Sequence, residues 1–103
     1  MAHSWTTKPV SEWLDLPPEA RETLTAYVEQ GREGGSFIMS LLENDLTRTV
    51  TRADSRNVHL LREYAMVLIW MLPPEAWGSR EKVNEWLSHD GMKGLEDEQS
   101  NHL

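Results

Sequence analysis

The pair of residues whose spacing most suggests chemistry is His59 and Glu63. They lie four residues apart, so a helix would place both side chains on one face, where they could share a metal ion. Zinc sites need three or four ligands, however, and the sequence offers no third one nearby. The chain also has no cysteine to serve as a nucleophile or thiolate ligand. We therefore predict no metal, no cofactor and no enzymatic activity, and an enzyme that uses His59 is the least favoured function.

A second group of reactive residue types is a run of polar side chains in the middle of the chain. Such residues concentrate at helix ends because their short side chains bond to backbone amides, and this structural interpretation is favoured. The functional interpretation is a polar pocket or a partner-binding ridge between two helices. Trp77 joins the functional set because we expect it in an exposed loop, and exposed tryptophans are enriched at binding hot spots. The candidate partner-binding residues are Asn44, Asp45, Arg52, Asp54, Asn57 and Trp77.

The charge of the chain limits its partners. Its 103 residues carry a formal net charge of −7, which argues against direct binding to nucleic acid because phosphate contacts require a basic face. Basic and acidic residues are interleaved, so a mixed solvated surface is favoured over mimicry of nucleic acid. No apolar stretch approaches the roughly 20 residues needed to cross a bilayer, and the N-terminus lacks the layout of a signal peptide. We expect a cytoplasmic protein without membrane contact.

Two of the helices that must position these residues are expected to start with one shared sequence. Leu16–Ala20 and Leu72–Ala76 are identical. Paired prolines suit a first helical turn because the amides there lack intrahelical partners anyway, and the glutamate that follows interacts favourably with the helix dipole. We expect each copy to introduce a short amphipathic helix that a glycine, Gly31 or Gly91, closes. Two independent uses of a common start signal are favoured over a duplication.

Hydrophobic periodicity predicts four helices. They cover residues 17–30, then Ser36 (as N-cap) to Asp54, then Asp54 or Ser55 to Leu72, and finally residues 80–89 after a cap at Ser79. In the second helix, apolar residues at three-to-four spacing, Leu46 and Val50 among them, are expected in the core. A break near Thr47, where threonines lower the helix propensity, is the alternative to one continuous helix.

The predicted fold is all-α, because no segment alternates as a half-buried strand would. We expect a compact bundle of about four helices in a single domain over residues 10–90, with a short helical turn over Val10–Leu16 before them. Residues 1–9 are expected to be flexible, and residues 91–103 are expected to form a disordered acidic tail.

The end of the third predicted helix is apolar on almost all sides, from Met66 to Leu72. This pattern indicates either the most central helix or a helix with an interface on its second face. Met66, Trp70 and Met71 could form a second apolar stripe, which would suit a homo-oligomer or a partner groove. Core and interface are equally favoured for this stripe.

Several short motifs between Leu16 and Leu87 resemble one known family. They are the Leu-Pro-Pro-Glu-Ala and Gly-Ser-Phe sequences, Asn44-Asp45-Leu46, Arg52-Ala53-Asp54 with Asn57, and Ala76-Trp77-Gly78-Ser79. Together they are similar to a family of small proteins, without an assigned activity, that bacteriophages, prophages and other mobile elements encode. The resemblance implies expression inside a bacterial host, and it implies no reaction.

These observations favour a binding function. The hypothesis is a small accessory protein of a phage or mobile element that binds and inhibits a host protein complex, with host defence or nucleic-acid-processing machinery as the target class. The small size, the acidic charge, the five tryptophans and the lack of a catalytic set favour it. The alternative is an oligomeric protein that binds a small ligand or nucleotide through the polar side chains between the second and third helices.

Overall fold

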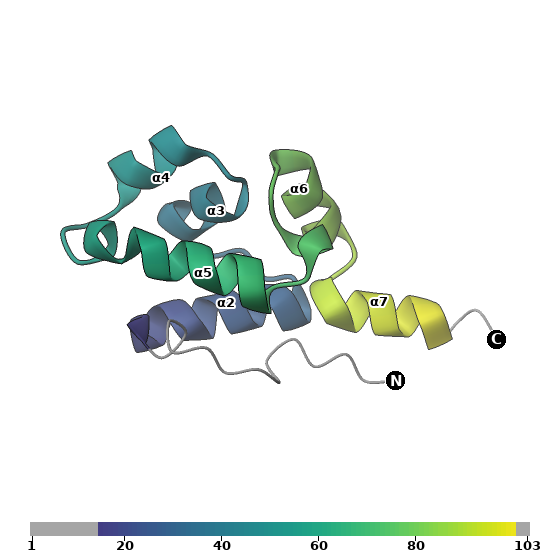
Figure 1. Ribbon diagram of the computed structural model, residues 1–103. Helices are drawn as coiled ribbons and strands as arrows, with labels where there is room; N and C mark the ends of the chain where they lie inside the picture. Colours follow the sequence, from purple (N-terminus) through teal and green to yellow (C-terminus); the bar gives the residue numbers. More distant parts are fainter. Residues whose placement is uncertain (1–14, 101–103) are drawn as a thin grey trace.

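The computed structural model describes residues 15–100, with side chains described as far as Leu95 (Figure 1). Every described element is helical, which confirms the predicted all-α fold. The predicted flexible residues 1–9, most of the predicted turn over residues 10–16 and the last three residues lie outside the described part. The elements in chain order are α2 (Pro18–Gln30), α3 (Ser36–Leu42), α4 (Leu46–Arg52), η1 (Asn57–Leu60), α5 (Leu61–Met71), η2 (Pro74–Ala76), α6 (Arg80–Ser88) and α7 (Gly91–Ser100).

The core lies where α2, α3, α5, η2 and α6 meet. At its centre, Tyr27 of α2 makes two long-range hydrogen bonds. Its hydroxyl donates to the Ala76 carbonyl at 2.6 Å, and its carbonyl accepts from Trp86 Nε1 at 2.9 Å. Burial raises the pKa of the Tyr27 hydroxyl, so it remains a donor. The hydrophobic core residues that are 0–1 % exposed are Leu24, Tyr27, Val28, Leu42, Tyr64, Val67, Ala76, Val83 and Trp86.

The two copies of the repeated pentapeptide adopt different structures. The first starts the 13-residue helix α2, with Glu19 in its first turn, as predicted. The second forms only the single 3₁₀ turn η2, because Trp77 returns to an extended conformation and Gly78 has a φ of 118°. The second copy therefore does not itself start a helix. α6 begins three residues later at the predicted cap, Ser79, whose Oγ accepts from the Lys82 amide at 3.2 Å.

The second predicted helix is broken, and the break lies before Thr47. α3 ends at Leu42, and Asn44 adopts a left-handed conformation with a φ of 61°. The helix then restarts as α4. This turn reorients the apolar residues that follow, so Leu46 and Val50, which were expected in the core, are 73 % and 42 % exposed. The first cap also differs, because Gly35 is the N-cap of α3 and Ser36 is its first helical residue.

The third predicted helix begins near the expected residues but as a 3₁₀ turn, and its α-helical part has two different faces. Asp54 Oδ1 accepts from the Asn57 amide at 2.7 Å and so begins the 3₁₀ turn η1, which continues into α5. On α5, Met71 is buried, whereas Ile69 and Trp70 are 57 % and 65 % exposed. Of the two interpretations of this apolar helix, the structure supports a second, outward face. Met71 belongs to the core and not to that face, which corrects the predicted stripe.

Residues 91–100 form helix α7 and are not disordered, so the predicted tail is wrong over this range. Met92 and Leu95 supply an apolar pair at helical spacing, and both pack against the core. Their burial stabilises a helix whose polar composition had suggested a solvated tail. α7 packs against α2, and in Figure 1 it continues roughly in the line of that helix.

Two glycines hold the end of α2 against the start of α7. Gly31 and Gly91 both have a φ of 66°, in the left-handed region. A Cβ on Gly91 would lie 2.6 Å from the Gly31 amide nitrogen and 2.7 Å from the Val28 carbonyl oxygen. Gly31 therefore closes α2 as predicted, whereas Gly91, predicted to close a helix, begins the next one. Only glycine fits this contact from either side.

Among the described helices, none is long and apolar enough to span a membrane.

Candidate protein-binding groove

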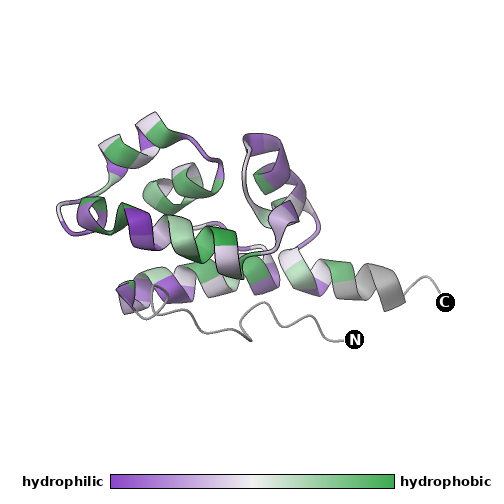
Figure 2. Ribbon diagram, in the orientation of Figure 1, coloured by the Kyte–Doolittle hydropathy of each residue, from purple (hydrophilic) through white to green (hydrophobic). Residues whose placement is uncertain are grey.

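An apolar groove of about 370 Å³ lies between α4 and α5. Figure 2 shows hydrophobic residues on both helices. Among the lining residues, Thr49 and Leu68 are the most buried, and Leu46 and Ile69 are largely exposed. The groove thus exposes apolar side chains to water, which is unfavourable. Its lining residues are Leu41, Asn44, Leu46, Thr49, Leu61, Ala65, Leu68, Ile69 and Trp77.

None of the residues that line the groove carries a charge. The polar groups are few, and one of them is already used, because Thr49 Oγ1 donates to the Asp45 carbonyl at 2.6 Å. Asn44 lies at one end of α4, in the left-handed turn. The chemistry that such a lining recognises is an apolar side chain, with little capacity to select a charged or strongly polar ligand.

Trp77 is held in place at this groove by the backbone. It is half-buried, in agreement with the expectation of partial exposure, and it follows η2 in an extended conformation. The next amide, that of Gly78, donates to the Leu42 carbonyl at the end of α3 at 2.8 Å. This bond fixes the loop against α3. An aromatic side chain on an ordered loop can contact a partner at a low cost in conformational entropy.

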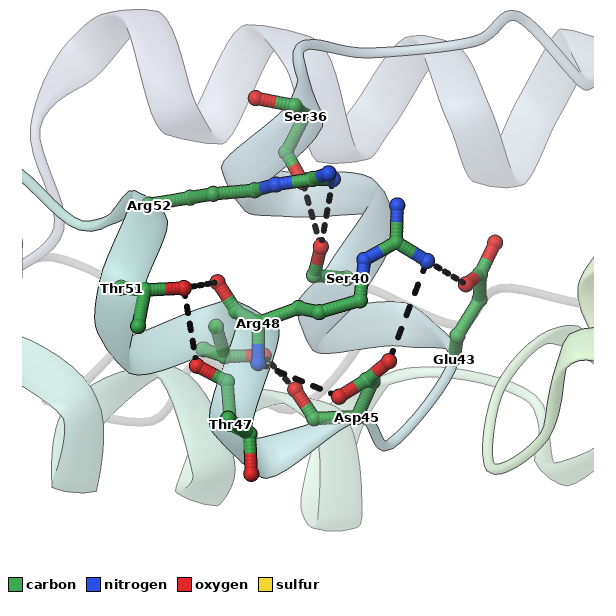
Figure 3. Close-up of polar contacts among 9 residues, drawn as sticks. Ser36, Ser40, Glu43, Asp45, Thr47, Arg48, Thr51 and Arg52 are labelled. Carbon is green, nitrogen blue, oxygen red and sulfur yellow. Dashed lines mark hydrogen bonds and ion pairs between the residues drawn. The ribbon is translucent and has the colours of Figure 1, made fainter.

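The turn that forms one side of the groove is stabilised by Asp45. Its Oδ1 accepts from the Arg48 amide at 3.1 Å, which caps α4. The Arg48 guanidinium lies 3.9 Å from both the Asp45 and the Glu43 carboxylates (Figure 3). These contacts set the start of α4 and therefore the position of Leu46, which immediately follows the cap. Asp45 thus positions the groove without lining it.

Removal of this cap tests that role. We expect Asp45→Ala to lower the free energy of unfolding by about 1 kcal/mol, the usual contribution of a side-chain N-cap. Asp45→Asn keeps an acceptor oxygen and is expected to lose less than half of that amount. Urea denaturation measures both. If the two variants lose equal stability, the charge of Asp45 matters more than its capping bond, and this explanation of the turn is wrong.

The other polar candidates have separate partners. Arg52 Nη1 donates to Ser40 Oγ at 3.2 Å, and Ser40 in turn donates to the Ser36 carbonyl (Figure 3). Asn57 Oδ1 accepts from the Tyr64 hydroxyl at 2.8 Å, and Asp54 caps η1. The polar run therefore does not form one pocket around Asp45, Arg52, Asp54 and Asn57. Asp45 and Asp54 accept from backbone amides, as the structural interpretation predicted, whereas Arg52 and Asn57 bond to side chains of neighbouring elements.

Asn57 does line a smaller pocket, of about 190 Å³, between α2, α3 and α5. Arg56 pairs there with Glu19 at the edge. The Glu19 carboxylate accepts a hydrogen bond from the Glu19 backbone amide and another from the Arg56 guanidinium. Both bonds hold the pKa of Glu19 below its ordinary value. Burial raises the pKa of Tyr64 to about 12, so its hydroxyl stays protonated and bonded to Asn57. Sequence reasoning did not select Arg56 or Tyr64 as site residues.

The His59–Glu63 pair does not develop into a recognisable site. His59 is exposed, and Glu63 is partly buried with one carboxylate oxygen, Oε2, that lacks a hydrogen-bond partner. Within the described part of the chain, no group of three histidine, aspartate or glutamate side chains could hold a metal ion. The His59–Glu63 pair is therefore weaker evidence for a functional site than the groove.

Comparison with known proteins supplies no relative. No protein-family model matches the chain, and no curated protein or solved structure matches it. The resemblance to phage and mobile-element proteins stays a prediction from the motifs.

Of the predicted partner-binding residues, the structure brings Asn44 and Trp77 together at the groove. Sequence reasoning missed Leu46 and Ile69, which are its most exposed aliphatic residues. Leu46 was assigned to the core because it keeps helical spacing with the residues of α3. The signal that could have placed it outside is the Asn44-Asp45 pair, since asparagine tolerates a left-handed turn and aspartate caps the helix that follows.

Proposed function

We propose that this chain is a protein-binding module, and that its groove receives apolar side chains of a partner protein. The observation that carries the proposal is the exposure of Leu46 and Ile69 on either side of an uncharged groove. Apolar side chains exposed together around a concave surface are typical of protein interaction sites. Two helices that flank a groove suit a partner helix, whose apolar residues at i, i+3 and i+4 would enter between them.

The charge of the protein indicates what surrounds those apolar residues on the partner. The groove itself is uncharged, while the whole chain carries a net charge of −7. Complementary charge at the edges of an interface increases the association rate and suppresses wrong partners. A partner that offers an apolar ridge surrounded by basic residues fits both properties.

The partner class follows from the motif resemblance. A small accessory protein of a phage or mobile element acts in the cytoplasm of its bacterial host, where defence and nucleic-acid-processing complexes expose basic surfaces. Binding of the groove to such a complex would block a contact that the complex needs, which is inhibition by occupancy. This function requires no catalytic residue in the chain.

Two substitutions on one helix test the groove. Leu46→Glu and Val50→Glu each replace an exposed aliphatic residue of α4 by a carboxylate, so both change the net charge equally, but only Leu46 lines the groove. Tagged wild type is incubated with nuclease-treated bacterial lysate, and the complex that it retains in stoichiometric amount is purified and titrated by calorimetry. We expect Leu46→Glu to weaken this affinity at least about 30-fold, as loss of a hot-spot residue does.

The matched variant Val50→Glu is expected to keep the affinity within about threefold of wild type. Circular dichroism checks that both variants stay folded. If a host complex binds Leu46→Glu as tightly as wild type, or if both variants lose it equally, the groove is not the binding site. If wild type retains no host protein, the proposed partner class is wrong.

A further inference from the structure

The outward face of α5 carries an apolar surface that adjoins the groove and shares Ala65 and Ile69 with it. We name it the α5 strip and define it as Ala65, Met66, Ile69 and Trp70. Its members lie at i, i+1, i+4 and i+5, so they form one face of the helix. Trp70 is 65 % exposed and Ile69 is 57 % exposed. Ala65 is exposed as well, Met66 is half-buried, and in Figure 1 this helix lies at the front of the molecule.

We propose that the α5 strip is the interface of a homodimer, in which it packs against the α5 strip of a second copy. A two-fold axis perpendicular to α5 makes the two α5 helices antiparallel, and the same surface of each copy then forms both sides of the interface. With the axis between Met66 and Trp70, each tryptophan ring lies against the methionine of the other copy. Thioether–aromatic contacts are favourable, and methionine adapts its shape to the ring.

The size of the strip matches what a small dimer needs. Trp70 and Ile69 dominate it, and with Met66 and Ala65 the four residues offer on the order of 350 Å² of apolar surface per copy. An interface at the lower end of the stable range buries about 600 Å² on each partner, of which about 65 % is apolar in homodimers, or about 400 Å². The strip therefore supplies most of the apolar part of a small, reversible interface.

The charge pattern favours a second copy over a charged partner at this face. From Tyr64 to Pro74 the sequence contains no charged residue, so the strip itself is uncharged. The remainder of each copy carries the net charge of −7, which opposes association at long range. Salt screens that repulsion and leaves the apolar contact intact. The dimer is thus expected to strengthen as salt is added, the opposite of an association driven by opposite charges.

Sedimentation equilibrium of the purified chain tests this proposal over roughly a hundredfold range of concentration. We expect wild type to shift from the mass of one 11.9 kDa chain towards twice that mass. Raising NaCl from about 0.05 M to about 0.5 M should tighten the dimer severalfold. Trp70→Glu should weaken it at least about 30-fold, because it removes the largest contact and places two carboxylates at the axis.

Val50→Glu is again the matched control, because it adds the same charge at an exposed apolar residue outside the strip. It should leave the dimer within about threefold of wild type. Because Trp70 is largely exposed, Trp70→Glu should remain folded, which circular dichroism checks. A single-chain mass for wild type at every concentration and salt, or a dimer that Trp70→Glu does not weaken, overturns the proposal.

Chemical cross-linking gives a second, independent readout. The chain contains no cysteine, so Met66→Cys introduces a single reactive thiol on the strip. A short bis-maleimide should join two copies of Met66→Cys and should fail to join two copies of Val50→Cys. This proposal does not rest on the host-binding function. Ala65 and Ile69 belong to both surfaces, but Leu46 lies in the groove and outside the strip, so Leu46→Glu should remain a dimer while it loses the host complex.

Discussion

Trp86→Ala is expected to lower the free energy of unfolding by about 3–5 kcal/mol. Trp86 is fully buried, stacks edge-to-face on His89, and donates from Nε1 to the Tyr27 carbonyl. Alanine would leave a cavity where α6 packs on α2 and would remove the bond that connects these helices. Because small domains are stable by only about 5–15 kcal/mol, this one substitution removes a large fraction of the total. Urea denaturation followed by circular dichroism measures the loss.

Two further variants separate the causes. Trp86→Phe keeps most of the ring but not the donor, and it is expected to lose about 1–2 kcal/mol, since the Tyr27 carbonyl still accepts from the Gly31 amide. Trp70→Ala removes an exposed tryptophan and should change stability by less than about 0.5 kcal/mol at a concentration where the chain is monomeric. A Trp86→Ala protein as stable as Trp70→Ala would show that α6 does not pack as described.

Gly91→Ala is expected to lower the free energy of unfolding by more than about 2 kcal/mol. An alanine at a φ of 66° is strained, and its Cβ would lie 2.6 Å from the Gly31 amide nitrogen, in backbone that cannot move aside without opening the α2–α7 contact. Both effects act in the same direction. Thermal unfolding should show a clearly lowered midpoint, and hydrogen exchange should show faster opening of α7 than in wild type.

Gly35→Ala is the control for this prediction. A Cβ there would meet nothing within 4 Å, and the φ of −70° is open to any residue. It should change stability by less than about 1 kcal/mol. If Gly91→Ala is as stable as Gly35→Ala, then the Gly31–Gly91 contact does not hold α7 against the bundle, and residues 91–100 behave as the tail that the sequence suggested.

Those parts of the fold that depend on local signals could be predicted from the sequence. α2 has a proline start, helical apolar spacing and a glycine end, and each signal acts within one turn of the residue that carries it. The caps at Ser79 and Asp54 are of the same kind. The all-α class follows from the same periodicity. In each of these cases the residues that interact are only a few positions apart in the sequence.

The parts that failed depend on distant contacts. The Asn44-Asp45 pair permits a left-handed turn and a new cap but does not require them, since a continuous helix would keep the same apolar spacing. The second pentapeptide copy carries the same local signals as the first but leads to Trp77 and Gly78, which α3 holds through Leu42. The groove depends on both features, because Leu46 enters it only after the turn and Trp77 only after the loop docks. The candidate site was therefore harder to predict than the fold.

The two long-range bonds of Tyr27 also bear on how the chain is made. On a ribosome, α2 is synthesised long before its partners: the Ala76 carbonyl lies 49 residues further along the chain, and the Trp86 indole lies 59 residues further. Until both have emerged from the ribosome, the apolar face of α2 lacks these native partners and is exposed to non-native contacts. Ribosome-bound chains that stop before α6 should accordingly recruit chaperones, whereas chains that extend through α7 should release them.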